Sequence, residues 1–127
     1  KASPGILGNV LAAVRGNNPT ACRANALRNM TYAQRFAEQL PQILELPSGA
    51  DHVASQNGLS TYETARLVES RLGCSESEVD RLILPDQKTY AERPRDFRLA
   101  SDKIQAAGIE LGTFEEDLDR CLADFGW

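Results

Sequence analysis

The chain has 127 residues, enough for one domain with a hydrophobic core, and its 42% hydrophobic and 25% charged residues are typical of a globular protein. Its net charge of −4 argues against general nucleic-acid binding. No apolar run approaches the roughly 20 residues of a membrane-spanning helix, and no signal peptide is visible. We therefore expect residues 1–127 to form a single domain.

The chain opens with a predicted helix. Pro4 lies near its start and Gly16 near its end, because proline is tolerated in the first turn and glycine commonly follows the last. The apolar residues between them recur at helical spacing: Ile6, Leu7, Val10, Leu11 and Val14. This stripe predicts a helix with one buried face, and a short strand is predicted after it at residues 19–23.

A second helix is predicted after Thr31. Thr31 and Gln34 have the spacing of a capping box, in which side chains bond the free backbone groups of the first turn. One face of this helix carries Tyr32, Phe36 and Leu40. Pro41 is expected to end or kink it, because proline has no N–H to donate.

The middle of the chain predicts a strand and a turn. Residues 49–54 form the predicted strand, and His52 is expected to find a partner in or beside it. The Asn-Gly dipeptide at residues 57–58 is a turn signal. A later apolar run at residues 82–84 is expected to end at Pro85.

Three later helices begin at predicted N-caps. Two of these are capping boxes, formed by Ser60 with Glu63 and by Thr113 with Glu116. The third N-cap is Ser101, whose helix is expected to stop at Gly108. Apolar faces follow the two capping boxes: Ala65, Val68 and Leu72, then Phe114, Leu118, Cys121, Leu122 and Phe125. We assign them to the core, and the helix-rich pattern with a few short strands predicts the α+β class.

Charge is distributed unevenly along the chain. No acidic residue precedes Glu38, whereas that part carries Lys1, Arg15, Arg23, Arg28 and Arg35. Residues 110–127 carry six acidic side chains and one basic side chain, Arg120. Because a local excess of one sign attracts the opposite charge, an anionic ligand is expected on the first third of the chain and not on the C-terminal helix.

A second basic stretch has three arginines, Arg93, Arg95 and Arg98, within six residues of predicted loop. Pro94 fixes its own φ angle and favours an extended Arg93. A guanidinium on a rigid loop suits a pair of phosphates, because its planar donors match phosphate oxygens. The alternative is a basic turn that only faces water.

The cysteines, Cys22, Cys74 and Cys121, form no Cys-x-x-Cys pair, and the chain has one histidine. No zinc ligand set can be assembled at the usual spacings, so no metal site is predicted, and the odd count favours a reducing, cytoplasmic compartment. The chain has no Gly-x-Gly-x-x-Gly and no Walker loop. It therefore has no recognisable means of holding a dinucleotide or ATP by itself.

Three blocks in order carry a resemblance to a known family. They are Arg-Asn-Met-Thr-Tyr-Ala-Gln-Arg-Phe-Ala at residues 28–37, Gly-Ala-Asp-His-Val-Ala-Ser at residues 49–55 with Leu-Ser-Thr-Tyr-Glu at 59–63, and Arg-Pro-Arg-Asp at 93–96 with Ser-Asp-Lys at 101–103. Together they resemble the C-terminal, substrate-binding domain of extended short-chain dehydrogenases/reductases that act on nucleotide sugars, the NAD-dependent epimerase/dehydratase family. The stretch from Ala91 to Leu99 is similar to the dTDP-4-dehydrorhamnose reductase branch, and the first block to the epimerase/dehydratase branch.

The resemblance gives two arginines a role. In the family, the positions of Arg28 and Arg93 approach the diphosphate of the nucleotide sugar, so both are implied to bind it. Asn9 and Arg95 are further candidates. The family's Rossmann half carries the Gly-rich turn and a Tyr-x-x-x-Lys pair, whereas here Tyr62 is followed at that distance by Arg66, and a guanidinium does not readily release a proton.

The resemblance also implies what this chain lacks. NAD or NADP is expected on a missing Rossmann half, with no cofactor, metal or catalytic residue on this chain. The implied partners are a nucleotide-diphosphate sugar and that half. The chain's face for the missing half should then be exposed, and the stripe of the first helix is the candidate surface for a homo-oligomer.

Four positions depart from the family's pattern. The aspartate and valine of the first block are Arg35 and Ala33 here, the glycine after the short strand is Ser55, and the glycine of Arg-Pro-Gly-Asp is Arg95. These departures bear on the substrate and leave the expected fold unchanged. Two other hypotheses stay open: a non-catalytic regulatory or protein-binding module of the same fold, and a small helical interaction domain that resembles the family by chance.

Overall fold

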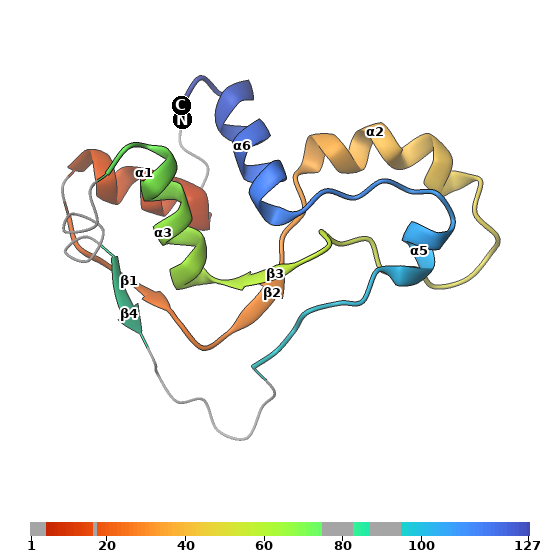
Figure 1. Ribbon diagram of the computed structural model, residues 1–127, viewed down its shortest axis with the longest axis horizontal. Coiled ribbons are helices and arrows are strands. Elements are labelled where there is room, and N and C mark those ends of the chain that lie inside the picture. The colour runs from red at the N-terminus through yellow and green to blue at the C-terminus, as the bar shows by residue number, and fades with distance from the viewer. Residues whose placement is uncertain (1–4, 17, 75–82, 87–94) are drawn as a thin grey trace. The chain divides into compact units, whose positions relative to one another are not determined.

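The computed structural model describes residues 5–16, 18–74, 83–86 and 95–127 (Figure 1). The chain divides into two compact units. Unit 1 spans Lys1–Leu27 and Leu59–Asp96, and unit 2 spans Arg28–Gly58 and Phe97–Trp127. Each unit therefore joins two stretches that are distant in the sequence.

The elements agree with the predicted helix-rich α+β class. The helices are α1 (Ile6–Gly16), α2 (Ala33–Leu44), α3 (Thr61–Arg71), α5 (Asp102–Ala106) and α6 (Phe114–Asp124), and the strands are β1 (Thr20–Arg23), β2 (Leu27–Asn29), β3 (Gly58–Ser60) and β4 (Ile83–Asp86). β1 pairs in parallel with β4, and β2 pairs with β3, so each sheet has two strands. Among the described residues, no helix has the length and apolar character that crossing a membrane requires.

In unit 1, α1 packs against α3, and α3 packs against the β1–β4 pair (Figure 1). The packing follows from the apolar faces, because Val10 and Leu11 of α1 and Ala65 and Val68 of α3 are all buried. α3 begins at the predicted capping box: the Ser60 hydroxyl accepts from the Glu63 N–H at 3.1 Å, and the Glu63 carboxylate accepts from the Ser60 N–H at 2.7 Å.

Pro85 does not end the apolar run as predicted. β4 continues through it to Asp86, and β1 pairs with β4 from Thr20 opposite Ile83 to Arg23 opposite Asp86. Within the described ranges, this sheet has two strands, so each strand has a free edge. Proline is tolerated at an edge because its missing N–H leaves no ladder bond broken.

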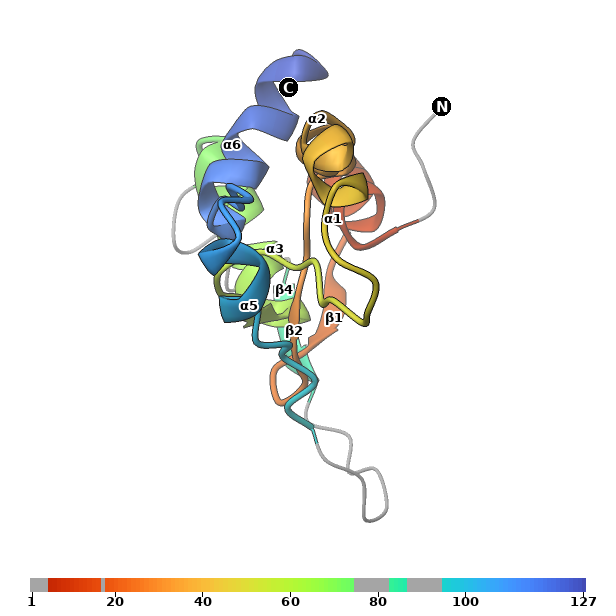
Figure 2. The same cartoon turned by 90° about the vertical axis from the view of Figure 1, so that its right-hand side faces the viewer.

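Unit 2 is organised around an apolar cluster of Ile104, Ile109 and Leu111, against which Ile43, Leu46 and Val53 pack. α6 begins at the predicted capping box of Thr113 and Glu116 and buries its apolar face. Figures 1 and 2 both show α2 beside α6, where the two helices exchange polar contacts. The predicted last apolar residue, Phe125, is instead exposed and stacks on Trp127 with ring centroids 5.2 Å apart.

The predicted capping box at Thr31 is wrong. The N-cap of α2 is Tyr32, which makes no side-chain cap bond, and the Thr31 hydroxyl instead accepts from the Ser55 N–H at 2.9 Å. The helix also runs through Pro41 to Leu44. A tertiary hydrogen bond has therefore replaced the local one that the spacing predicted.

The predicted strand at residues 49–54 is also absent. The strand lies later, at Gly58–Ser60, so the Asn-Gly dipeptide leads into β3 where a turn was expected. His52 is exposed, and within the described part of the chain its side chain has no partner. The expectation that His52 is satisfied in or beside a strand is therefore wrong.

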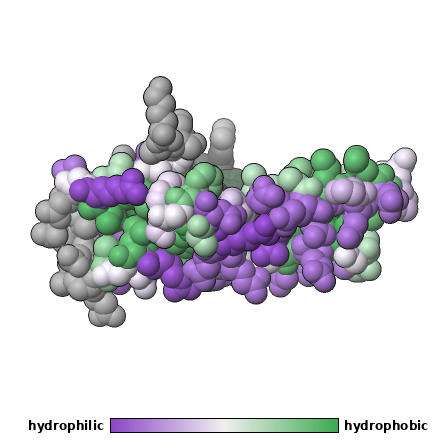
Figure 3. Space-filling model, turned by 90° about the horizontal axis from the view of Figure 1, so that it is seen from above, coloured by the Kyte–Doolittle hydropathy of each residue, from purple (hydrophilic) through white to green (hydrophobic). Residues whose placement is uncertain are grey.

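The exposed apolar surface is not on α1. In the stripe of α1, Val10 and Leu11 are buried and the other three residues are half-buried. In contrast, α2 leaves Phe36, Leu40 and Leu44 exposed. The space-filling view in Figure 3 shows hydrophobic surface beside a band of hydrophilic side chains. The candidate interaction surface moves from α1 to α2 accordingly.

Candidate functional site

Hydrogen bonds link β2, which carries Arg28, to residues 95–99. In unit 1, the Leu27 N–H donates to the Arg95 carbonyl at 2.9 Å, and Leu27 forms a parallel bridge with Asp96. In unit 2, the Leu99 N–H donates to the side-chain oxygen of Asn29 at 2.7 Å. The segment at residues 95–99 therefore follows β2, which carries Arg28. Arg93 lies outside the described residues.

Asn29 holds this part of unit 2 together. Its amide nitrogen donates to the carbonyls of Ser55 at 2.7 Å and Asn57 at 3.3 Å, while its oxygen accepts from Leu99. One side chain thus ties β2 to two segments that are far away in the sequence. Since both ends of the amide are occupied by backbone groups, Asn29 acts as a structural clamp.

Asn57 extends the clamp to the start of α6. Its side-chain oxygen accepts from the Phe114 N–H at 2.7 Å, and its amide nitrogen donates to the Glu115 carboxylate at 2.8 Å. The first N–H groups of a helix have no partner inside the helix, so this oxygen satisfies one of them. The sequence reasoning missed Asn29 and took Asn57 only as a turn residue.

Ser55, where the family has glycine, is fully buried and fully bonded. Its hydroxyl accepts from the Met30 N–H at 3.2 Å and donates to the Asn57 carbonyl at 2.9 Å, and its own N–H donates to Thr31. The hydrogen bonds to these partners compensate for the loss of water around the buried hydroxyl. This departure is therefore used inside the fold, and the hydroxyl is not available to a ligand.

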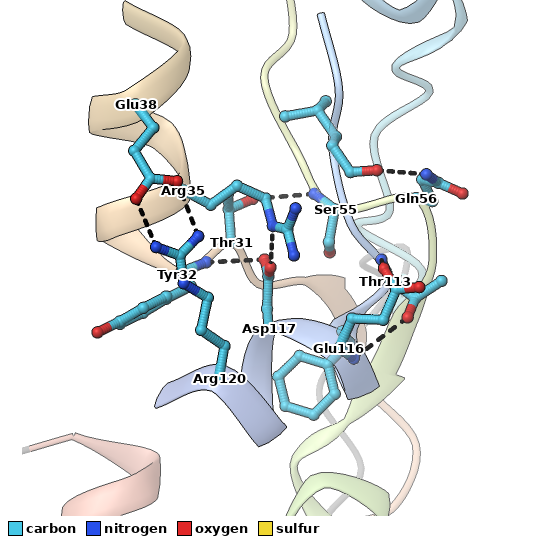
Figure 4. Close-up of polar contacts among 12 residues, drawn as sticks. Thr31, Tyr32, Arg35, Glu38, Ser55, Gln56, Thr113, Glu116, Asp117 and Arg120 are labelled. Atoms are coloured by element: carbon cyan, nitrogen blue, oxygen red, sulfur yellow. Dashed lines mark hydrogen bonds and ion pairs between the residues drawn. The ribbon is translucent and has the colours of Figure 1, made fainter. Parts of the chain in front are cut away.

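Arg35, the other large departure, is also used internally (Figure 4). Its guanidinium forms an ion pair with Asp117 of α6, and the other carboxylate oxygen of Asp117 accepts from the Tyr32 N–H at 3.0 Å. The Asp117 side chain is 3% exposed and that of Arg35 is 22% exposed. The guanidinium also lies against Gly112, where an added Cβ would come within 2.7 Å of it.

A second ion pair joins α2 to α6 at the surface. Both guanidinium arms of Arg120 reach the Glu38 carboxylate, one of them at 2.7 Å. The hydrogen bonds from Arg120 hold the pKa of Glu38 at about 2, below its ordinary 4.5. Both side chains are well exposed, so this pair contributes little net stability.

Arg28 presents its charge to solvent. Its side chain is exposed, and among the described residues it has neither a hydrogen bond nor an ion pair. Its backbone carbonyl faces Gly58 of β3, and the side chain of Arg98 lies against the same glycine. An exposed arginine without an internal partner is the form that a ligand-binding arginine is expected to take.

The further candidates have different surroundings. Asn9 is exposed on α1 in unit 1, and in the described part of the chain its side chain makes no hydrogen bond. Arg95, also in unit 1, is half-buried, and its carbonyl is bonded to Leu27. In unit 2, the backbone of Arg28 and the stem of Arg98 both lie against Gly58. The sequence reasoning assigned Arg98 no role.

Tyr62 and the cysteines are the other reactive side chains that the structure describes. The Tyr62 hydroxyl accepts from Arg66 one turn along α3 at 3.2 Å, with the guanidinium over its ring. Burial raises the pKa of the Cys22 and Cys121 thiols, so both stay protonated and weakly nucleophilic at neutral pH. Over the described ranges, no three His, Cys, Asp or Glu side chains cluster as metal ligands would.

A family model described as RmlD substrate binding domain matches residues 6–126. The fold is similar to that of dTDP-4-dehydrorhamnose reductase from Bacillus anthracis in complex with NADP, with a TM-score of 0.80 and 16% identity over 98% of this chain and 44% of that chain. It is also similar to dTDP-4-dehydrorhamnose reductase from Yersinia enterocolitica, with a TM-score of 0.75 and 17% identity over 93% of this chain and 42% of that one.

A third similar structure is the Bordetella bronchiseptica enzyme WbmG in complex with NAD, with a TM-score of 0.73 and 17% identity over 94% of this chain and 37% of that one. This chain therefore spans less than half the length of each of these proteins. No curated protein sequence matches it significantly. At these identities the likeness shows the fold, whereas the family model covers nearly the whole chain.

Proposed function

Since this chain belongs to the family of RmlD substrate-binding domains, we propose that it binds a nucleotide-diphosphate sugar, with Arg28 and Arg93 on the diphosphate. The observation that carries the proposal is the side-by-side course of β2 and residues 95–99, two basic stretches that are nearly 70 residues apart in sequence. A guanidinium matches the oxygens of a phosphoryl group, and a diphosphate offers one such group to each of the two proposed arginines.

The reaction we propose for the complete enzyme is reduction of the sugar, because two of the similar structures are named as reductases. A nicotinamide cofactor would supply the hydride when bound to a Rossmann half. The residues of this chain do not fit a dinucleotide, since the sequence has no Gly-rich strand–turn–helix unit. Their part is to hold the diphosphate and orient the sugar, which lowers the entropic part of the barrier.

The clamp residues explain how the exposed Arg28 is held in place. Asn29 follows Arg28 directly and is bonded at both ends of its amide, which fixes the backbone from which the guanidinium extends. A fixed backbone reduces the ordering cost of binding. Asp117 and Asp124 of α6 are paired with Arg35 and Arg120. Glu38 of α2 is also paired with Arg120, so these carboxylates do not compete for Arg28.

A thermal-shift series with dTDP, UDP and GDP sugars tests the proposal, because a ligand of the native state raises the unfolding temperature. Arg28→Ala and Arg93→Ala should each weaken the best ligand roughly tenfold to a hundredfold, since a charge-assisted hydrogen bond contributes about 1.5–3 kcal/mol. Arg93→Lys should weaken it as well, because an ammonium makes no planar fork. Arg71→Ala, at the exposed end of α3, removes the same charge as a control.

A protein-binding role is the second candidate, and the exposed apolar face of α2 favours it. The two functions are separated by one comparison. The diphosphate proposal is wrong if no nucleotide sugar raises the unfolding temperature of wild type and Arg28→Ala behaves like wild type. The protein-binding role is then preferred. A Rossmann half that lacks a Tyr-x-x-x-Lys pair would point the same way.

A further inference from the structure

An Asn-Gly dipeptide, Asn57 and Gly58, leads into β3. Asn57 uses both ends of its side-chain amide: the oxygen accepts from the Phe114 N–H at 2.7 Å, and the nitrogen donates to the Glu115 carboxylate at 2.8 Å. An amide offers both an acceptor and a donor, whereas an ionised carboxylate has no hydrogen to donate. Aspartate therefore cannot replace Asn57 without the loss of a bond to α6.

The second residue of the dipeptide, Gly58, occupies a place where no side chain fits. An added Cβ would lie 2.9 Å from the carbonyl oxygen of Arg28 in β2, the strand that pairs with β3, and 2.6 Å from Cγ of Arg98. Real Cβ atoms essentially never approach other atoms this closely. The backbone of Gly58 is not in the left-handed region, so this close approach and not its own conformation requires the glycine.

The pair that the fold requires is also chemically labile. Asparagine deamidates most readily before glycine, which has no side chain to shield its nitrogen. The nitrogen of Gly58 bonds to Cγ of Asn57, the bond from Cγ to Nδ2 breaks, and Nδ2 leaves as ammonia with the proton from Gly58. Water then opens the succinimide ring. It gives aspartate when it adds to Cγ, and isoaspartate when it adds to the backbone carbonyl carbon of Asn57.

The contacts of Asn57 oppose the reaction and destabilise its product. The attack moves Cγ of Asn57 onto the nitrogen of Gly58, and a side chain bonded to α6 at both ends of its amide resists this movement. The Asn57 carbonyl is also held, because it accepts from the side chains of Asn29 at 3.3 Å and Ser55 at 2.9 Å. An aspartate product would place a carboxylate against Glu115, and since both positions are half-buried, water screens the repulsion incompletely.

We infer that Asn57 is a deamidation site that the fold of unit 2 keeps unreacted, and that reaction there releases the start of α6 from the segment before β3. A local opening that frees the Asn57 side chain exposes the labile pair, and the charged product then disfavours reclosing. The modification therefore proceeds in one direction, from a transient opening of unit 2 to a lasting one.

Peptide mapping by mass spectrometry, after incubation of the chain at pH 8 in buffer and in urea, tests the protection. Asn57 should deamidate at least about tenfold more slowly in the folded chain, because reaction there needs a local opening. Glu115→Ala removes one of the two bonds that hold the amide and should raise the rate in buffer but not in urea. Glu110→Ala, which removes an exposed acidic side chain of the same unit, is the control. Equal rates for wild type in buffer and urea, or equal rates in buffer for the two variants, would overturn the protection by these contacts.

Asn57→Asp tests the effect of the product. It should lower the urea concentration at which the chain unfolds, and Glu115→Gln in the same chain should recover most of this loss, because a glutamine amide can donate to the new carboxylate. If Asn57→Asp does not fold, as judged by circular dichroism, the double variant carries the test, since it should fold. Unfolding of Asn57→Asp at the same urea concentration as wild type, or an equal loss with and without Glu115→Gln, would show that the product does not release α6 by repulsion.

Discussion

α1 and α2 are both amphipathic, yet they are held in opposite ways. In unit 1, α1 is buried through its apolar face, with Leu11 2% exposed. In unit 2, α2 buries no residue fully; its polar side is bonded to α6 through Arg35 and Glu38, while Leu44 on its apolar side is 76% exposed. The comparison teaches that amphipathicity marks two faces without saying which of them the fold uses.

Truncating one leucine in each helix should show the largest difference in stability between α1 and α2. Leu11→Ala removes a buried side chain from α1 and should lower the free energy of unfolding by about 3 kcal/mol, the usual cost of such a cavity. Leu44→Ala deletes the same atoms from an exposed position and should change it by less than about 0.5 kcal/mol. Urea denaturation of both variants measures the difference. Equal losses would mean that the apolar face of α2 is covered in solution.

Asp117→Ala should break the polar attachment of α2. It leaves the Arg35 guanidinium without its carboxylate and the Tyr32 N–H without its acceptor. Breaking a buried pair costs about 3–5 kcal/mol, and because Arg35 is partly exposed we expect about 2.5 kcal/mol here. Asp119→Ala, an exposed change two residues along, is the control for helix propensity and charge. A loss no larger than that of the control would show that α2 is held by something else.

Gly112→Ala should act through the same ion pair. The new methyl would come within 2.7 Å of the guanidinium carbon of Arg35 and push it away from Asp117. We expect a loss of about 2 kcal/mol, as is usual for overpacking at a tight site. In the Asp117→Ala background the loss should shrink, since the pair is already broken. Purely additive losses in urea denaturation would contradict this coupling.

Local signals in the sequence predicted well the elements that depend on neighbouring residues. The capping boxes at Ser60 and Thr113 formed as their spacing indicates, because every partner lies within one turn. The box at Thr31 has the same spacing and failed, because the Ser55 N–H, 24 residues away, takes the hydroxyl. No local pattern contains that competitor.

The candidate site likewise has features that the sequence predicted and features that depend on distant partners. The composition of the first third marked Arg28 and Arg35 alike as candidates to attract an anion. It did not tell Arg28, which is exposed, from Arg35, which is paired with a residue 82 positions away. The role of Gly58 was also hidden, since an Asn-Gly dipeptide is first of all a turn signal. Long-range partners decide these cases, and a single sequence does not show them.

The exposed apolar face of α2 should also cause the chain to self-associate. Phe36, Leu40 and Leu44 together form an apolar surface of the kind that marks interfaces. We expect the chain to self-associate at high concentration, and Leu44→Lys to reduce this while leaving the free energy of unfolding unchanged within about 0.5 kcal/mol. Sedimentation velocity measures the association. If Leu44→Lys associates as strongly as wild type, the association uses a surface other than the apolar face of α2.

The smallest effect should come from the surface pair of Glu38 and Arg120, and it should depend on pH. The pKa of Glu38 is about 2 in the fold and near 4.5 in the unfolded chain. A lowered pKa stabilises the fold above the unfolded value, and this contribution is lost as the pH falls from about 4.5 to 2. The stability difference between wild type and Glu38→Gln should therefore be constant above pH 5 and disappear towards pH 2. Because both side chains are exposed, 1 M NaCl should reduce it at every pH, whereas the effect of Asp117→Ala should be much less sensitive to salt. Acid titrations of urea unfolding at low and high salt measure both dependences. A Glu38→Gln difference that is independent of pH would show that the carboxylate charge does not hold this end of α2.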